Sequence, residues 1–529
     1  MNAKMDSGTP PETKQPALLN DIENDTIVNR LTCATLEGVN ARVVEVEATF
    51  TKGLPGFTIV GLAGNDIQEA KERTKAALLT NGFVFPPLRI TVNLSPTELK
   101  KQGSQLDLSI ALLIALNKQK IDEEGLYVFG ELGLDGRVKS SSMLFPLILS
   151  LKEQGRIHRA IVPAEALEHL SHIPGVDFYP VATLIEAITL VKEKRFEGRM
   201  ASFEYDAESV EVNGATYYYE RSYPQDFKEV KGQQVAKRAA LIAAAGMHNF
   251  FMEGSPGCGK SMIAKRIGYI LPPLSEEEIL SIAKHQFLDG TTPTFRAQRP
   301  VRSPHHTATS ASIFGGGSIQ AKIGEVSLAD SGVIFFDEIP HFSKAVLEAM
   351  REPLQDRRVL ISRVNSKIEY KANVQFLAAM NPCPCGNLLS KTRACRCSDV
   401  EIKRYRNKLS DPFLDRLDLF VVMQEISSED RGDISSAQMH EQVIAAFVRQ
   451  KERHQPNLNG KLTEEEIETF CRLNPEAARI LESAISRFAL THRSIASIKK
   501  VARTIADLSG HEGIEKSDVL EALSYRRRK

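Results

Sequence analysis

Eight consecutive residues of this chain have the types and spacing of a phosphate-binding loop. They are Gly254, Ser255, Pro256, Gly257, Cys258, Gly259, Lys260 and Ser261, and they match G-x-x-x-x-G-K-[ST] at each fixed position. Glycines let backbone N–H groups turn toward phosphate, the lysine reaches the outer phosphates of ATP, and the serine hydroxyl is a ligand for Mg²⁺. A short apolar strand is expected before this P-loop (residues 248–252) and a helix after it (262–267). The sequence therefore predicts a site for ATP and Mg²⁺ in which Lys260 is catalytic.

Polar side chains follow two further apolar segments. Asp337 and Glu338 come directly after residues 332–336, which read as a buried strand. An Asp at such a place holds Mg²⁺ together with the P-loop serine, and the adjacent Glu can orient or deprotonate the attacking water. Asn381 ends another apolar strand (374–380), where its amide is expected to act as the γ-phosphate sensor called sensor 1. The alternative is that these are ordinary solvated groups at strand ends.

Two arginines are candidates for stabilising charge in the transition state. Arg416, in the segment Asp411-Pro-Phe-Leu-Asp-Arg, is the predicted arginine finger. Arg493, at the start of a C-terminal helix, is the predicted sensor 2, with Arg503 as second choice. A surface ion pair is the alternative for each of them.

Four of the seven cysteines fall within fifteen residues, as Cys383, Cys385, Cys395 and Cys397. In extended backbone, residues i and i+2 project to one face, so two C-x-C pairs can close a tetrahedral zinc site. Because this spacing is tighter than the usual C-x₂-C, free or redox-sensitive thiols are the alternative to structural Zn²⁺. A metal here would hold the loop that follows Asn381. The adjacent His305 and His306 rarely share one metal geometrically, and we expect a structural role for them.

A local basic surface surrounds the cysteines, although the chain as a whole has 67 basic and 67 acidic residues and no net charge. Nucleic-acid binding therefore has to come from local patches. Together with Tyr405, this surface is the best candidate for contacting DNA, and a solvated loop is the alternative. Its basic residues are Lys391, Arg393, Arg396, Lys403, Arg404, Arg406 and Lys408.

The elements that must position these residues indicate an α/β multidomain protein. Its 529 residues suit about three domains. We expect a disordered tail (1–26), an α+β domain (27–196), a connector (197–225), a parallel-sheet core (226–425) and a helical lid (426–529). Strands are expected at residues 43–51, 89–93, 127–129 and 160–162, and helices at 65–80, 106–117, 464–471, 475–489, 494–508 and 516–524.

The chain is expected to be cytoplasmic. Its longest apolar run, residues 106–116, is too short to cross a membrane, and its N-terminus lacks the apolar segment of a signal peptide.

Several longer segments resemble the AAA+ ATPases of the magnesium-chelatase-like ComM/YifB family, over nearly the whole chain after the tail. Asp411 departs from the family pattern, which usually has glycine before the proline. The segments that carry the resemblance are residues 53–61 (GLPGFTIVG), 226–233, 302–306 (RSPHH), 324–329 (GEVSLA), 381–386 (NPCPCG) and 502–508 (ARTIADL).

This resemblance implies a homo-hexameric ring with ATP at the subunit interfaces, so that Arg416 acts on a neighbour's nucleotide. It also implies a hairpin before sensor 1, and residues 359–363 and 367–370 have the strand-turn-strand pattern that such a hairpin needs. Arg363 and Lys367 flank its turn and are candidates for touching a phosphate backbone in the pore. An ordinary solvated hairpin is the alternative.

The region before the core resembles the Lon-protease-type domain, a fold of the ribosomal protein S5 domain 2 kind. Alignment with the Ser–Lys dyad of Lon proteases puts Gln105 at the serine and Phe145 at the lysine. Ser104, one residue from the serine position, is a weak reserve candidate. A nucleophilic serine needs a base within hydrogen-bond reach, so this domain is expected to be proteolytically inactive.

The implied function is ATP-driven, helicase-like branch migration of recombination intermediates, notably in natural transformation. DNA, further copies of the chain and recombination proteins are the implied partners, without a membrane. The alternatives are the ATPase motor of a magnesium-chelatase-type enzyme and an ATP-dependent protease, the latter disfavoured by the missing dyad.

Overall fold

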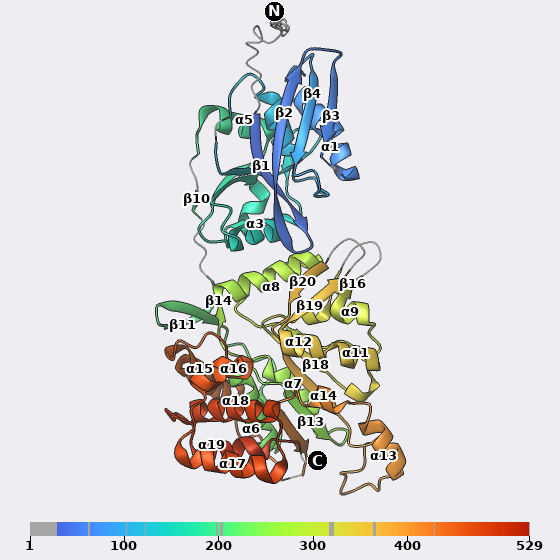
Figure 1. Cartoon of the computed structure of the whole chain (residues 1–529), viewed down its shortest axis with the longest axis vertical. Coiled ribbons are helices and arrows are strands. Elements are labelled where there is room, and N and C mark those ends of the chain that lie inside the picture. The colour runs from blue at the N-terminus through green and yellow to red at the C-terminus, as the bar shows by residue number, and fades with distance from the viewer. Residues whose placement is uncertain are drawn as a thin grey trace, which may run out of the picture.

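The computed structural model describes residues 29–527, apart from 62–63, 102, 122, 197–198, 201–204, 317–321, 363–366 and 428. An N-terminal α+β domain stands on an α/β core, and the C-terminal helices pack against the core (Figure 1). This confirms the predicted α/β multidomain architecture with a parallel-sheet core and a helical C-terminal region. The predicted tail, 1–26, lies outside the described residues.

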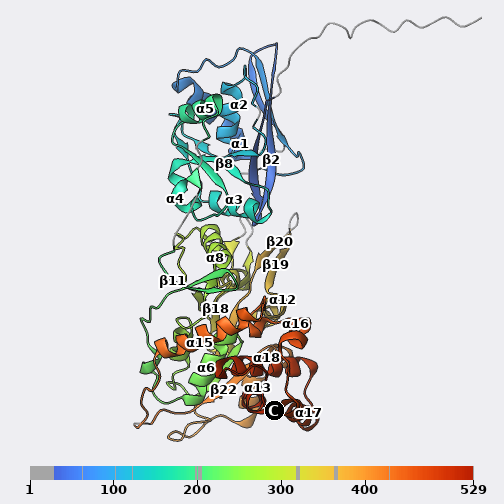
Figure 2. The same cartoon turned by 90° about the vertical axis from the view of Figure 1, so that its left-hand side faces the viewer.

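The N-terminal domain is built on an eight-stranded mixed sheet with the order β10-β9-β8-β5-β1-β2-β4-β3. Residues of β4 alternate between buried and at least partly exposed, because helices cover one face of the sheet (Figure 2). The strands are β1 (Asn29–Glu37), β2 (Asn40–Thr51), β3 (Gly56–Val60), β4 (Arg89–Ser95), β5 (Leu126–Val128), β8 (Arg159–Pro163), β9 (Asp177–Val181) and β10 (Arg199–Met200). The helices are α1 (Asn65–Thr80), α2 (Asp107–Ala115), α3 (Leu144–Glu153), α4 (Leu167–Leu170) and α5 (Leu184–Glu193), and β6 (Glu131–Leu132) pairs with β7 (Val138–Lys139).

The segment expected to be a connector contains a β-hairpin. Strands β11 (Glu208–Val212) and β12 (Ala215–Tyr219) pair with each other, and β12 pairs with β14 (Leu274–Ser275) of the core. The three tyrosines at 217–219 therefore belong to a small sheet attached to the core.

The core sheet has five parallel strands in the order β15-β18-β21-β13-β22. Phe250 and Met252 lie in the apolar cluster on one face, and Phe251 lies in the cluster on the other. Because both faces are covered, the strands are apolar throughout, and polar residues appear only where they end. The strands are β13 (Phe250–Gly254), β15 (Val301–Arg302), β18 (Val333–Phe336), β21 (Gln375–Met380) and β22 (Leu419–Met423).

Helices and two short hairpins complete the core. The hairpin β19–β20 rises from the core toward the N-terminal domain (Figure 2). The helices are α6 (Gln234–Gly246), α7 (Lys260–Ile267), α8 (Glu276–Asp289), α9 (Ser310–Phe314), α10 (Glu325–Leu328), α11 (Lys344–Ala349), α12 (Arg351–Asp356), α13 (Asp399–Arg406) and α14 (Asp411–Leu414). The hairpins are β16 (Gly315–Gly316) with β17 (Lys322–Ile323) and β19 (Arg358–Ser362) with β20 (Lys367–Lys371).

Five helices form the C-terminal region, and α15 and α18 pack on α6 of the core. The four predicted helices agree with the structure to within two residues at each end. The helices are α15 (Ser436–Glu452), α16 (Glu464–Phe470), α17 (Pro475–Phe488), α18 (His492–Ser509) and α19 (Lys516–Ser524).

Helix α8 joins the N-terminal domain to the core. The ring of Phe145 in α3 stacks on Phe287 of α8 with 4.8 Å between centroids, and Lys284 Nζ lies 2.8 Å from the carboxylate of Glu153. A second contact lies at the β1–β2 turn, where Val39 packs against the cluster of Ile323, Ile368 and Tyr370. Across the described part of the chain, no helix is both long and apolar enough to span a membrane.

Candidate active site

The P-loop lies between β13 and α7, as its flanking sequence predicts. Gly257 and Gly259 have φ angles of 81° and 99°, a region that side chains with a Cβ rarely enter. These angles place the loop around the N-terminus of α7, where free backbone N–H groups favour an anion. The loop is therefore shaped to receive phosphate.

Lys260 connects the P-loop to the end of β21. Its Nζ donates to the backbone oxygens of Gly254 (2.6 Å) and Ser255 (3.0 Å) and to Oδ1 of Asn381 (3.1 Å). Burial lowers the pKa of Lys260, and the negative charges of Asp337 and Glu338 act in the opposite direction. The structure thus brings the predicted lysine and the predicted sensor 1 amide into direct contact.

The two acidic residues lie at the end of β18, next to the P-loop. Ser261 Oγ donates to Oδ2 of Asp337 at 2.7 Å, so the two predicted Mg²⁺ ligands already face each other. Glu338 is exposed and has a φ of 48°, a strained backbone for a residue with a side chain. Asp337 supports this turn by accepting the N–H of Glu338. The pair can hold a divalent cation through Asp337 and leave the Glu338 carboxylate facing solvent.

Arg416 and Arg493 lie together at one glutamine side chain. Both donate to Oε1 of Gln355 in α12, Arg416 Nη2 at 2.6 Å and Arg493 Nη2 at 3.1 Å. Burial and the neighbouring charges of Arg493 and Arg351 lower the pKa of Arg416. Among the described residues, no hydrogen bond joins either arginine to the P-loop or to the two acids. No sequence motif pointed to Gln355 or Arg351, which only the fold brings to this cluster.

Arg503, the second choice for sensor 2, is a structural residue of the C-terminal region. Its side chain is 2% exposed and donates to Asp507 and to the backbone oxygens of His511 and Glu512. No nucleotide can reach this guanidinium without breaking those bonds.

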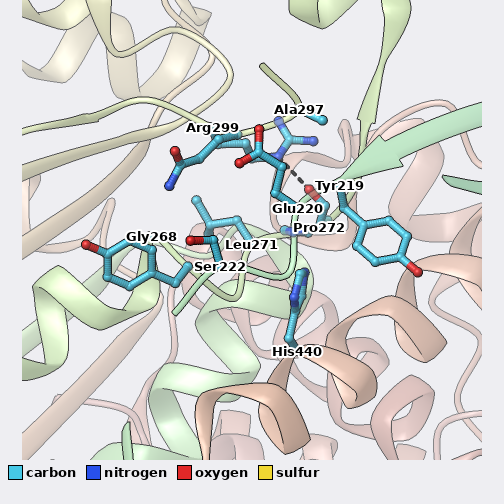
Figure 3. A pocket seen from close by; sticks show the side chains of 11 residues that line it. Tyr219, Glu220, Ser222, Gly268, Leu271, Pro272, Ala297, Arg299 and His440 are labelled. Carbon is cyan, nitrogen blue, oxygen red and sulfur yellow. Dashed lines mark hydrogen bonds between the residues drawn. The ribbon is translucent and has the colours of Figure 1, made fainter. Parts of the chain in front are cut away.

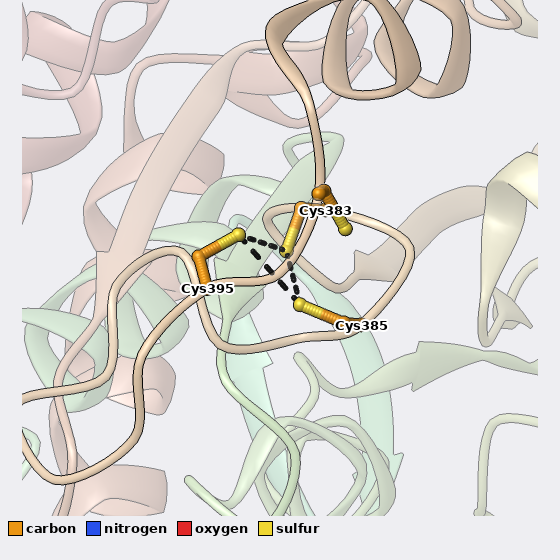
Figure 4. Close-up of side chains that lie close together, drawn as sticks. Cys383, Cys385 and Cys395 are labelled. Atoms are coloured by element: carbon orange, nitrogen blue, oxygen red, sulfur yellow. Dashed lines mark hydrogen bonds between the residues drawn. The ribbon is translucent and has the colours of Figure 1, made fainter.

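The four cysteines converge, as their spacing predicts (Figure 4). Cys383 Sγ lies 3.4 Å from Cys385 Sγ and 3.7 Å from Cys395 Sγ, and Cys385 and Cys395 are 3.6 Å apart. With Cys397, all four sulfurs lie within 4.8 Å of one another. In the described ranges this is the one group of three or more His, Cys, Asp or Glu side chains arranged to hold a metal ion. His305 instead contacts the hydroxyl of Thr307, at 2.8 Å.

Comparison with known proteins identifies the family. Three family models match: subunit ChlI of magnesium chelatase over residues 226–431, a further ChlI model over 46–166 and the ChlI C-terminal model over 433–526. The chain is 37% identical over 500 residues to competence protein ComM of Haemophilus influenzae, covering 92% of this chain and 95% of that one. It is 38% identical over 504 residues to YifB of Escherichia coli, with the same two coverages.

The chain belongs to the magnesium-chelatase-like ComM/YifB family. It is therefore an AAA+ ATPase motor, and ATP and Mg²⁺ are the ligands that its P-loop and acidic pair are built to hold.

This ComM/YifB protein is also similar, over part of its length, to Lon protease 2 of Bacillus subtilis, with 28% identity over 151 residues, 27% of each chain. Phe145, aligned with the Lon lysine, packs against α8, and Gln105 donates to the backbone oxygen of Ala34. Ser104 Oγ donates to the carboxylate of Glu131. The partner of this serine is therefore an acid and not the lysine that a Ser–Lys dyad needs.

Tyr405 does not take part in the basic surface around the cysteines. Its side chain is buried in the core, and burial raises its pKa to about 12. The prediction that Tyr405 faces DNA is therefore wrong, because α13 turns this residue inward. The basic residues are exposed, although Arg406 pairs with Glu253 at 2.7 Å. Arg363 of the hairpin lies outside the described residues.

A small pocket between β12, α7 and α15 is separate from this chemistry (Figure 3). Arg299 on its wall donates to the backbone oxygens of Pro272, Pro273 and Ser331, and His440 contacts Tyr223 at 2.8 Å. None of the residues that line it belongs to the P-loop or the acidic pair. The pocket therefore lies outside the ATP site, at the place where the β11–β12 hairpin meets the core.

Proposed function

We propose that this protein is an ATP-hydrolysing ring motor that acts on DNA and drives helicase-like branch migration of recombination intermediates. Cofactors are ATP and Mg²⁺, with Zn²⁺ as a structural ion at the four cysteines. The printed name of its Haemophilus relative, a competence protein, supports a role in DNA uptake and recombination. Partners are DNA, five further copies of the chain and recombination proteins, and the site of action is the cytoplasm.

The observation that carries this proposal is the separation of the arginines from the rest of the active site. Lys260 and Asn381 meet at the P-loop, whereas Arg416 and Arg493 meet at Gln355. The guanidinium groups of Arg416 and Arg493 repel each other, and with that of Arg351, which pairs with Glu348 at 2.8 Å, they form a site that favours an anion. In a ring this anion is the γ-phosphate of the adjacent subunit, so each active site is completed across an interface.

Each residue at such an interface has a separate role in ATP hydrolysis. Ser261 and Asp337 would hold Mg²⁺, which would supply positive charge beside the phosphates. Lys260 orients the terminal phosphate, and Asn381 positions it against the water that Glu338 orients or deprotonates. Arg416 from the neighbour stabilises the charge that develops as the phosphate leaves. Hydrolysis at one site therefore depends on how two subunits sit together, which is how a ring converts chemistry into movement.

Two surfaces are candidates for contacting DNA. One is the β19–β20 hairpin, which rises beside the N-terminal domain; the other is the exposed basic surface around α13. They lie at different ends of the core (Figure 1). We assign strand engagement in the pore to the hairpin and auxiliary phosphate contacts to the α13 surface. The N-terminal domain, lacking a Ser–Lys dyad, serves in ring formation or DNA binding and does not cleave peptides.

The deciding experiment measures ATP turnover with and without a four-way DNA junction at several salt concentrations, together with strand exchange on a gel. We expect the junction to stimulate ATP turnover. We also expect only the wild-type protein to convert the junction into separate duplexes by branch migration. Lys260→Ala is the matched variant that keeps the DNA surfaces. If the junction neither binds nor changes turnover at low salt, the DNA proposal is refuted.

The family models favour one second candidate, the ATPase motor of a magnesium-chelatase-type enzyme. Such a motor would hydrolyse ATP without regard to DNA and would need partner subunits that hold a porphyrin. The same assay separates the two, because only the DNA motor changes its turnover when the junction is added.

A further inference from the structure

The loop that carries the cysteines touches the P-loop at two places. Asn381, at its start, accepts a hydrogen bond from Lys260, and Gly386 packs against Pro256 so closely that a Cβ on Gly386 would lie 2.6 Å from the proline ring. Cys383 and Cys385 lie in the chain between these two contacts. The cysteine cluster is thus attached directly to both contacts that this loop makes with the P-loop.

Little else holds this loop in place. Residues 381–398 contain neither helix nor strand. The backbone bonds within it are turns, such as Gly386 N–H to Cys383 O at 3.0 Å, and Glu425 holds the N–H of Lys391 at 3.0 Å. A segment with so few backbone bonds keeps one conformation only if its side chains are cross-linked or well packed.

The sulfur positions fit a metal site, and no pair of these sulfurs is bonded as a disulfide. Zinc–sulfur bonds of about 2.3 Å in a tetrahedron place sulfurs about 3.8 Å apart, and a disulfide requires about 2.05 Å. The three closest separations are 3.4, 3.6 and 3.7 Å. Four thiolates without an oxygen ligand favour Zn²⁺ among the common divalent ions. The exposed side chains of Arg393 and Arg396 lie in the same loop and oppose the net negative charge of such a site.

We propose that Zn²⁺ bound by Cys383, Cys385, Cys395 and Cys397 keeps Asn381 and the P-loop in their relative positions, so that ATP affinity and turnover depend on zinc. This inference rests on the proposed ATPase function but not on DNA as its substrate. The cysteines act as positioning residues, because none of them lies among the groups that would touch the γ-phosphate. Their effect reaches the nucleotide through Asn381 and through the contact of Gly386 with Pro256.

The first test compares zinc content and ATP kinetics in full-length proteins. We expect about one zinc per chain in wild type and in Cys33→Ala, whose thiol is buried in the N-terminal sheet, and none in Cys383→Ser. Loss of zinc should raise KM for ATP by about tenfold or more and lower kcat, as loss of supporting groups around a site does. Treating wild type with a zinc-selective chelator in excess Mg²⁺, and then restoring Zn²⁺, covers the case in which Cys383→Ser does not fold.

The second test breaks the contact and keeps the ligands. Gly386→Ala forces a side chain against Pro256, whereas Gly214→Ala has the same φ of 79° with nothing within 4 Å of its new Cβ. We expect both variants to retain zinc and only Gly386→Ala to raise KM for ATP.

Two results would overturn the inference: wild type that contains no zinc and takes none up, or zinc removal that leaves KM and kcat unchanged. Failure of the DNA proposal would look different. Zinc content and ATP kinetics would then follow the expectations above, but junction DNA would not affect turnover.

Discussion

Arg416→Ala tests the completion of the active site by a neighbouring subunit. Since one oxygen of Gln355 accepts from Arg416 at 2.6 Å and from Arg493 at 3.1 Å, the two nitrogens lie less than about 6 Å apart. Two unit charges at about 6 Å repel by about 0.7 kcal/mol in water and by about 3 kcal/mol at an effective dielectric constant of 20. Because Arg493 is exposed, the lower value applies.

Stability and activity should therefore respond differently to this change. The relief of repulsion offsets the loss of the hydrogen bonds of Arg416, so the free energy of unfolding should change by less than about 1 kcal/mol. The turnover number for ATP should fall by about 10³-fold or more, because an arginine finger contributes at least that much. Arg487→Ala, an exposed arginine that contacts the ring of Phe488, is the control and should change neither quantity.

Mixing two inactive variants shows whether the arginine acts across an interface. A subunit with Arg416→Ala keeps its own P-loop, and one with Lys260→Ala keeps its arginine. In randomly mixed rings about a quarter of the interfaces combine an intact P-loop with an intact neighbouring arginine, so activity should reappear. Turnover by Arg416→Ala alone, or a mixture as inactive as its components, would refute the reasoning.

Four further changes have expected outcomes of their own. Glu338→Gln should lower kcat for ATP by about 10²- to 10⁴-fold and leave ATP binding intact, measured by single-turnover hydrolysis and nucleotide titration. Phe145→Ala removes the buried ring that stacks on Phe287 of α8, between the N-terminal domain and the core. It should lower the free energy of unfolding by about 3 kcal/mol in urea titrations. Burial lowers the pKa of His440 to about 4, so the stability that this neutral histidine contributes above pH 6.5 should be lost as the pH falls from 6.5 to 4, by up to about 3 kcal/mol; His440→Gln should remove this contribution and leave that of His172, whose pKa burial also lowers to about 4. Reversing the charges of Lys403 and Arg404 to Glu should weaken junction binding and reduce the slope of log Kd against log salt, with ATP turnover in the absence of DNA unchanged.

Matched changes at exposed positions serve as controls for three of these. Phe488→Ala removes a ring that is 58% exposed and should leave stability nearly unchanged. His492→Gln replaces an exposed histidine and should keep the pH dependence of wild type. Lys516→Glu reverses a charge on the C-terminal helices and should leave the salt slope as it is. A control that behaves like its partner variant would contradict the explanation given for that variant.

Local patterns predicted the elements of this chain better than the contacts between them. Helix α1 begins and ends at Asn65 and Thr80 as predicted, because its apolar period and the turn at Asn81-Gly82 are both readable in sequence. The P-loop and Asn381 are positioned by strands whose apolar runs are equally plain. By contrast, the meeting of Arg416 with Arg493 depends on how the C-terminal helices dock on the core, which no local pattern encodes. The inward direction of Tyr405 depends on the packing of α13 in the same way.

The N-terminal domain contacts the core through two regions of different character. Helix α8 and the loop after it make a broad contact through Phe287, Lys284 and Phe295, whereas the β1–β2 turn packs only on the small cluster that includes Ile368 of β20. A hairpin that shifts during an ATP cycle would either displace this turn or break its contact with it. A movement of the hairpin that we assign to DNA would therefore reach the N-terminal domain first at the β1–β2 turn.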